Sequence, residues 1–189
     1  ATSAAENVII GYLAGSAQAA SSGLNVVIGN EAAEEMTSMS EATVVGYKAA
    51  TSNTTGSHIL ALGYQAYDGA DTENHNLAIG SNALGGAVAG GEYNVAVGNY
   101  SLDALTSADF CTAVGYEAGS AVTTGLKATL VGYGAGKVQT TAQNTTLVGY
   151  NAGVANTAHE CTAFGSEAAL ANTSGSGILA IGREAYKTG

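Results

Sequence analysis

The sequence predicts an all-β protein, a parallel β-solenoid (β-roll) built from about eleven coils of seventeen residues each. Three observations support this fold class. A glycine preceded by apolar residues recurs at intervals of 16 to 18 residues, mostly 17, along the whole chain. The chain contains no proline, which could not donate a hydrogen bond to a central β-ladder. A short strand, a bend and a polar loop that repeat at constant period are typical of a solenoid.

The first element of each unit is a short strand of apolar and β-branched residues, such as 42–45 (ATVV) and 59–62 (ILAL). In a solenoid, each strand pairs in parallel with the equivalent strand of the next coil, roughly 4.8 Å away. Eleven coils then form a rod roughly 50 Å long. A repeat of two helices needs about 33 residues, so the period of 17 excludes a helical solenoid.

The second element is a bend at the recurring glycine, which adopts backbone conformations that a Cβ atom would penalise. Three residues after the glycine stands alanine in ten units and Ser101 in the other. This near-constant small residue predicts a corner too tight for a larger side chain. The structural bends are assigned to Gly11, Gly29, Gly46, Gly63, Gly80, Gly98, Gly115, Gly132, Gly149, Gly165 and Gly182.

The residue directly after the glycine is tyrosine in six units, which makes this column a candidate aromatic ladder. Neighbouring rings would stabilise the stack by packing on one another. The rings could equally be presented to sugars, because tyrosine is enriched at recognition surfaces. The ladder consists of Tyr12, Tyr47, Tyr64, Tyr116, Tyr133 and Tyr150.

Both faces of the strand are apolar. Side chains alternate along a strand, so the residues one and three before each glycine share a face, which we expect to fill the coil interior. The residue two before each glycine would then point outward, yet it is apolar in every unit from Ile9 to Ala180. Such a stripe covers roughly 500 Å², near the limit for a monomer. We therefore expect this column to form the contact of a symmetric homo-oligomer.

The repeat resembles a known family. The stretches 42–66 (ATVVGYKAATSNTTGSHILALGYQA), 76–84 and 94–98 are similar to repeats of phage tail fibres, and also to the head repeats of trimeric autotransporter adhesins. The resemblance covers essentially the whole chain. It implies a parallel homotrimer of left-handed β-solenoids on a virion or cell surface. The period here is longer than in adhesin heads, which favours the tail-fibre branch.

Composition limits the partners of the chain. Fifteen acidic residues against five basic ones give a formal net charge of −10, which disfavours nucleic acid and anionic lipid. No apolar run approaches the roughly 20 residues of a membrane-spanning helix, so no direct membrane insertion is expected. Residues 1–189 form a single repeat domain that starts and ends inside the repeat, and we expect a fragment of a longer fibre protein.

Few residues are candidates for chemistry. Three scattered histidines and two cysteines assemble no catalytic constellation, so we expect no enzyme activity and no cofactor. Asp68, Asp71 and Glu73 crowd one loop and are weak candidates for a metal such as calcium, although the twelve-residue calcium-loop pattern is absent. His58 and His75 each lie five residues before a glycine of the repeat, so they should stack on adjacent coils.

Cys111 and Cys161 each lie four residues before a glycine of the repeat, three coils apart. At roughly 4.8 Å per coil their Cα atoms stand about 14 Å from each other. This separation is too large for a disulfide within one chain. We expect both to be buried free thiols on the face assigned to the oligomer contact.

The leading functional hypothesis is a structural and adhesive segment of a trimeric phage tail fibre in the virion. Its partners would be its own copies and a host-surface glycan or protein, met by variable loops such as 51–57 and 68–75. One alternative is the head of a bacterial trimeric autotransporter adhesin, at the cell surface. A more distant alternative is an ice-binding solenoid, because five threonines share one column, although we expect that column to face inward. They are Thr43, Thr112, Thr129, Thr146 and Thr162.

Overall fold

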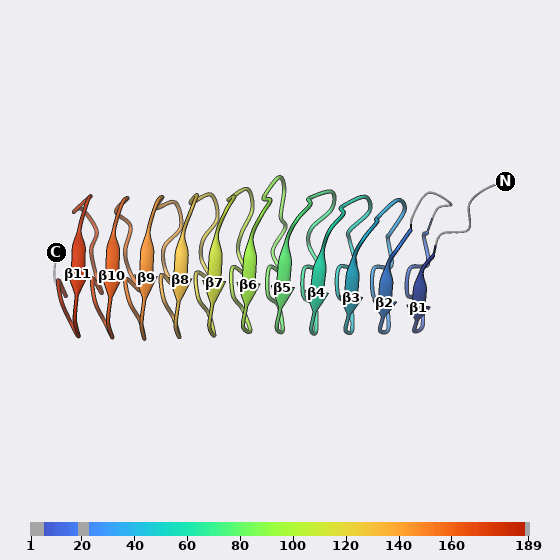
Figure 1. Cartoon of the computed structure of the whole chain (residues 1–189), viewed down its shortest axis with the longest axis horizontal. Helices are drawn as coiled ribbons and strands as arrows, with labels where there is room; N and C mark the ends of the chain where they lie inside the picture. Colours follow the sequence, from blue (N-terminus) through green and yellow to red (C-terminus); the bar gives the residue numbers. More distant parts are fainter. Residues whose placement is uncertain (1–5, 19–22, 188–189) are drawn as a thin grey trace.

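The computed structural model describes residues 6–18 and 23–187. They form a rod of stacked coils, with the two ends of the chain at opposite ends of the rod (Figure 1). The described residues contain no helix, and hence none that could cross a membrane. The strands are β1 (Val8–Ile10), β2 (Val26–Ile28), β3 (Thr43–Val45), β4 (Leu60–Leu62), β5 (Leu77–Ile79), β6 (Val95–Val97), β7 (Thr112–Val114), β8 (Thr129–Val131), β9 (Thr146–Val148), β10 (Thr162–Phe164) and β11 (Leu179–Ile181).

These strands form one parallel sheet in sequence order, with the register that the glycine spacing predicts. Each strand residue pairs with the residue at the same distance from the next glycine, as in Ile9 with Val27 and Leu130 with Leu147. Ten spacings of about 4.8 Å give a sheet about 48 Å long. The predicted fold class, an all-β parallel solenoid with coils of about 17 residues, is confirmed, whereas its handedness and the homotrimer stay predictions.

One extra residue in a coil is absorbed by a loop and leaves the sheet unchanged. The coil from Gly80 to Gly98 is one residue longer than most. Its loop rises above the neighbouring loops near β5 (Figure 1). The pairing of β5 with β6 nevertheless keeps its register, Ile79 opposite Val97. Variation in repeat length is therefore tolerated away from the strand.

The coils also bend at three further positions, most of which carry ordinary side chains and the others glycine. In the coil that begins at Gly63, the φ angles of Gln65, Tyr67 and His75 are 49°, 60° and 58°. Such left-handed conformations cost on the order of 1–3 kcal/mol each outside glycine. All three residues donate their backbone N–H to a carbonyl of an adjacent coil, at 2.9 to 3.1 Å. Hydrogen bonds between coils thus offset the conformational cost of the bends.

The recurring glycine is required by the close approach of neighbouring coils. At Gly132 φ is +131°, and a Cβ atom there would lie 2.4 Å from the carbonyl oxygen of Gly149 in the next coil. At Gly182, in the last coil that the structure describes, a Cβ atom would meet nothing within 4 Å. Two separate costs therefore exclude a side chain from the inner bends: the positive φ and the clash between coils.

Two interior columns compensate each other in size. The middle residue of each strand packs inside the coil near the residue four positions after the following glycine. A Cβ atom on Gly153 would come within 2.7 Å of the Leu147 side chain. In most coils the summed size of the pair is thus similar, as close packing favours. Large strand residues accompany glycine (Ile9 and Gly15, Leu130 and Gly136, Leu147 and Gly153), valines accompany alanine (Val27 and Ala33, Val44 and Ala50), and four alanines accompany large residues (Ala61 and Tyr67, Ala78 and Leu84, Ala96 and Leu102, Ala180 and Tyr186). Two coils depart from this pattern with small residues in both columns, Ala113 with Gly119 and Ala163 with Ala169.

We predict that exchanging the large and the small interior residue within one coil restores most of the stability that each single substitution loses. Leu147→Ala alone should lose about 2–5 kcal/mol through the cavity it leaves. Gly153→Leu alone should lose about 1–3 kcal/mol through overpacking. The double variant reproduces the pair Ala96 and Leu102, and φ is similar at Gly153 (54°) and Leu102 (48°), so its loss should be well below the sum. Urea unfolding of the four proteins measures this coupling, and additive losses would show that the columns do not share one volume.

We also predict that Gly132→Ala lowers the melting temperature more than Gly182→Ala. Both changes place a side chain at strongly positive φ, 131° and 115°. Each should therefore cost roughly 1–3 kcal/mol in backbone strain. Only the first adds a clash with the next coil. Thermal unfolding followed by circular dichroism compares them, and equal losses would mean that strain alone requires the glycine.

Candidate functional site

The strands turn their side chains the opposite way from the sequence-based expectation. From β2 to β11 the middle residue is buried, while the residues on either side of it are partly or fully exposed. The column from Ile9 to Ala180 fills the coil interior, so its assignment to an oligomer contact is wrong. The two outward strand columns are mostly apolar as well, with threonine at five positions, so the polar alternation that normally marks the outward face is weak. Residue size indicates the inward column instead. The middle residue is alanine in six strands, and the narrow interior of a coil favours small residues.

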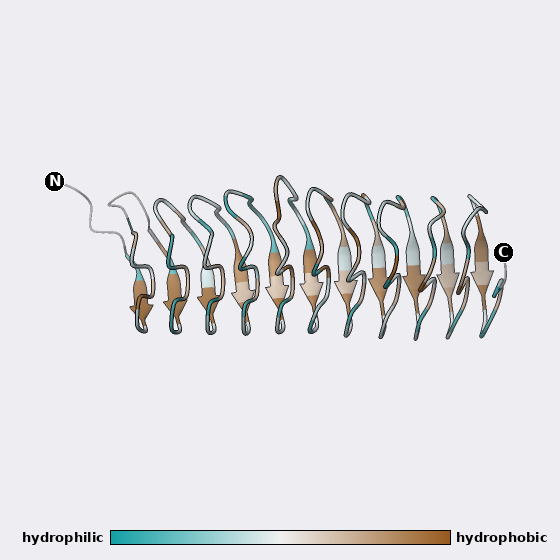
Figure 2. Ribbon diagram, turned by 180° about the vertical axis from the view of Figure 1, so that it is seen from behind, coloured by the Kyte–Doolittle hydropathy of each residue, from teal (hydrophilic) through white to brown (hydrophobic). Residues whose placement is uncertain are grey.

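The outward face of the sheet is mostly apolar along the rod. Figure 2 shows the strands side by side, hydrophobic over most of their length and pale where β3 and β7 to β10 begin with threonine. Exposure is greatest in the terminal strands, where Ile10 is 59% and Ile181 is 69% exposed. We call the two outward columns the apolar face. It comprises Val8, Ile10, Val26, Ile28, Thr43, Val45, Leu60, Leu62, Leu77, Ile79, Val95, Val97, Thr112, Val114, Thr129, Val131, Thr146, Val148, Thr162, Phe164, Leu179 and Ile181.

The apolar face is large for an isolated chain. A length of about 48 Å and a width of about 10 Å for three strand residues give roughly 500 Å². Patches of this size lie at the upper end for monomers and often mark interaction sites. No charged side chain belongs to the face. Covering it would contribute on the order of 12 kcal/mol, at about 25 cal/mol per Å².

The tyrosines that follow the glycine bend form stacks in part of the rod. Tyr47 stacks on Tyr64, and Tyr133 stacks on both Tyr116 and Tyr150, with ring centroids 5.4 to 5.5 Å apart and interplanar angles of at most 20°. Among the described residues, Tyr12 of the predicted ladder stacks on no other ring. Stacking covers the ring faces, so the ladder presents mainly edges and hydroxyls to solvent. A sugar that packs on a ring face would find one at the end of a stack or on Tyr12, which is 71% exposed.

The sequence predicted only the first two rings of a second stack. His58 and His75 stack at a centroid distance of 4.6 Å, which confirms the expectation for adjacent coils. The stack continues through Tyr93 and Phe110 at 4.8 and 5.3 Å. The signal available in the sequence was their common position, five residues before Gly98 and Gly115. Tyr93 and Phe110 are about half exposed, at 49% and 56%.

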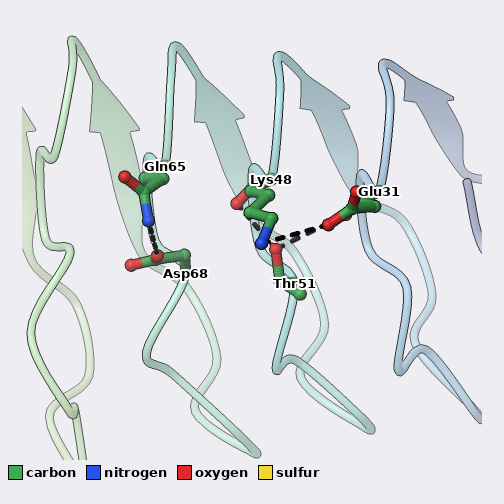
Figure 3. A network of polar contacts seen from close by, with 5 residues as sticks. All are labelled: Glu31, Lys48, Thr51, Gln65 and Asp68. Carbon is green, nitrogen blue, oxygen red and sulfur yellow. Dashed lines mark hydrogen bonds and ion pairs between the residues drawn. The ribbon is translucent and has the colours of Figure 1, made fainter.

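The three carboxylates considered as metal ligands have separate partners. Asp68 accepts a hydrogen bond from the Gln65 side chain at 3.0 Å (Figure 3). Asp71 accepts one from the Thr54 hydroxyl at 2.6 Å. Glu73 is buried and accepts three backbone N–H groups from two neighbouring coils, at 2.8 to 3.0 Å. These side chains organise loops, and the described residues contain no group of three or more side chains placed to hold a metal.

Ion pairs link neighbouring coils away from the apolar face. Lys48 Nζ lies 3.1 Å from Glu31 Oε2 of the preceding coil, and the Thr51 hydroxyl donates to the Lys48 carbonyl at 2.8 Å (Figure 3). The partners are solvent-accessible, so each pair contributes little to stability. The pairs neutralise basic groups of an otherwise acidic rod. Two further pairs use a glutamate at the same repeat position but a lysine three residues later in the coil, Lys137 with Glu117 and Lys187 with Glu167.

Both cysteines are buried free thiols, as predicted, but they lie inside the coil and not at an oligomer contact. Their column faces inward together with the middle residue of the strand. Cys111 Sγ donates to the Gly125 carbonyl at 3.2 Å, and the Asn94 amide makes the equivalent bond one coil earlier, to the Ala108 carbonyl at 2.9 Å. The thiol thus replaces an amide in the interior hydrogen-bond pattern. Burial raises the pKa of both thiols, which keeps them protonated and unreactive.

The described residues form no pocket. Comparison with protein-family models, with curated proteins and with solved structures finds no match to this chain. The molecule is therefore defined by its fold as a β-solenoid rod, and by its surface as a rod with one continuous apolar face.

Proposed function

We propose that this chain is a structural and adhesive segment of a homotrimeric fibre, in which parallel copies cover one another's apolar face. The observation that carries the proposal is the face itself, which runs the length of the rod without a charged side chain. A surface of roughly 500 Å² on one chain calls for a partner.

The periodicity of the face favours a second copy of the same chain over an unrelated partner. Outward side chains recur at every strand, about 4.8 Å apart, over about 48 Å. A parallel copy offers the same spacing over the same length, so contacts repeat coil by coil. A closed symmetric assembly is the usual way to satisfy such a surface. The threefold number comes from the resemblance to tail-fibre and adhesin repeats.

The rod is suited to hold or reach a receptor. A continuous hydrogen-bonded ladder makes it stiff, while the loops vary from coil to coil in sequence and length. Loops on a rigid scaffold commonly carry recognition, and we assign host contact to loops such as 51–57 and 68–75. Three copies would present each loop three times, which raises avidity without new contacts.

The resemblance favours a phage tail fibre in the virion over the alternative, an adhesin head on a bacterial surface. The sequence that flanks the segment separates the two. A self-cleaving chaperone domain after the repeats would support the fibre, and a membrane anchor would support the adhesin.

We predict that Val131→Glu dissociates the oligomer and Val138→Glu does not. Val131 belongs to the apolar face, whereas Val138 is 53% exposed and lies outside that face. A buried carboxylate in the contact would be strongly unfavourable, but the same side chain is tolerated in water. Light scattering at micromolar concentration should report a trimer for the parent chain and Val138→Glu, and smaller species for Val131→Glu. A folded monomeric parent would contradict the proposal.

One observation favours a second candidate function, ice binding. Four threonines of the apolar face, Thr112, Thr129, Thr146 and Thr162, occupy adjacent strands β7 to β10 in register. They face outward, so the expectation that this threonine column points into the coil is wrong. A regular array of exposed threonines is what an ice-binding surface requires. Ice binding and oligomer formation would use the same face and therefore exclude each other.

Thermal hysteresis decides between the two functions. An ice-binding chain should be a monomer and delay ice growth, and the double variant Thr129→Leu/Thr146→Leu should lose that activity while keeping its fold. A trimeric chain without thermal hysteresis would exclude ice binding and leave the fibre proposal standing.

A further inference from the structure

Two histidines on adjacent coils present their rings side by side at the surface. The rings of His58 and His75 lie 4.6 Å apart between centroids, with an interplanar angle of 17°, and both side chains are exposed. We propose that this pair binds one divalent late first-row transition-metal ion, with Cu²⁺ the tightest and Ni²⁺ and Zn²⁺ weaker. Neutral imidazole is the commonest protein ligand of such ions.

The backbone holds the two side chains in parallel. Both histidines have φ of 58°, and each donates its N–H to a serine carbonyl of the preceding coil at 3.1 Å. The side chains therefore leave the rod in the same direction, one coil apart. This preorganisation belongs to the fold, because the same left-handed position recurs in every full coil of the described rod. A metal that joins the two rings would need no rearrangement of the main chain.

The surroundings of the pair suit a cation. Glu41, at the same position one coil earlier, places Oε2 2.9 Å from His58 Nε2. A carboxylate that engages one ring nitrogen is the typical support of a metal-binding histidine, since it orients the ring and leaves Nδ1 for the metal. On the other side, Tyr93 stacks on His75 at a centroid distance of 4.8 Å. In the neighbouring column, the Glu92 carboxylate accepts a hydrogen bond from Asn74, the residue before His75.

The geometry defines the kind of site. Metal–nitrogen bonds of about 2.0–2.1 Å require the two ligating nitrogens to lie about 3–4 Å apart. The ring separation of 4.6 Å is slightly larger, and the exposed rings can tilt toward each other to close the difference. No third side chain is placed to join them among the described residues, so water would complete the coordination. Imidazole ligands with open positions favour Cu²⁺ in the usual affinity order.

The site does not depend on the proposed fibre. Both ligands belong to one chain, and neither is part of the apolar face. Metal binding is therefore expected of a monomer and of a trimer alike, with one ion per chain. A chain that proves monomeric would overturn the fibre proposal and leave this one untouched.

The experiment is a Cu²⁺ titration of the chain without a polyhistidine tag, followed by calorimetry and electron paramagnetic resonance at pH 7.5. We expect one ion per chain and a nitrogen-coordinated spectrum. His58→Asn or His75→Asn should lower the affinity for Cu²⁺ at least tenfold. Glu41→Gln should lower it about tenfold, as is usual when a carboxylate that supports a metal-binding histidine is removed. Asparagine is tolerated at this backbone position, because Asn144 occupies it with φ of 55°.

His159→Asn is the matched control. This third histidine accepts a backbone N–H from Gln143 through Nδ1 and lies outside the ring stack. Its replacement should leave Cu²⁺ binding unchanged. Circular dichroism of each variant verifies the fold. Binding that survives His58→Asn or His75→Asn, or that disappears in His159→Asn, would overturn the paired site.

Discussion

The stacking of each coil on the next by backbone hydrogen bonds is the constraint on which the rest of the structure depends. Parallel pairing in register places every residue directly beside its equivalent in the adjacent coils. A steric or hydrogen-bonding requirement at one position in a coil therefore applies to the equivalent position of every coil. The glycine bend shows this most clearly, because a Cβ atom at Gly132 would collide with the carbonyl of Gly149 one coil away. Ring stacks and interior amide bonds follow from the same rule.

Narrow coils also explain why so much apolar surface remains outside. The interior has room for one strand side chain per coil, and its size is matched by the residue beside it, as for Leu147 and Gly153. Larger β-branched and aliphatic residues that favour the strand therefore point outward, although they are hydrophobic. The same constraint that builds the rod thus leaves the apolar face. In the proposed fibre, copies of the chain would cover this face.

Stacking also creates sites that no local motif reveals. His58 and His75 are separated by 17 residues, yet their rings lie 4.6 Å apart and have Glu41 beside them. Tyr93 and Phe110 extend the same stack, although nothing near them in the sequence indicates a neighbour. In contrast, Asp68, Asp71 and Glu73 are close in sequence but have separate hydrogen-bond partners. In a solenoid, distance from the glycine bend predicts proximity better than distance along the chain.

The sequence by itself determined the period, the strand positions, the register and the column of glycines, because each of these repeats eleven times and depends only on spacing. It also determined that Cys111 and Cys161 are too far apart to pair. The tertiary structure alone decided which strand face points inward. Val27 and its neighbours Val26 and Ile28 are all apolar, so polarity could not distinguish them, and only the space inside the closed coil selected the middle residue. The left-handed bends at ordinary residues such as His75 likewise depend on hydrogen bonds to an adjacent coil, which a sequence does not display.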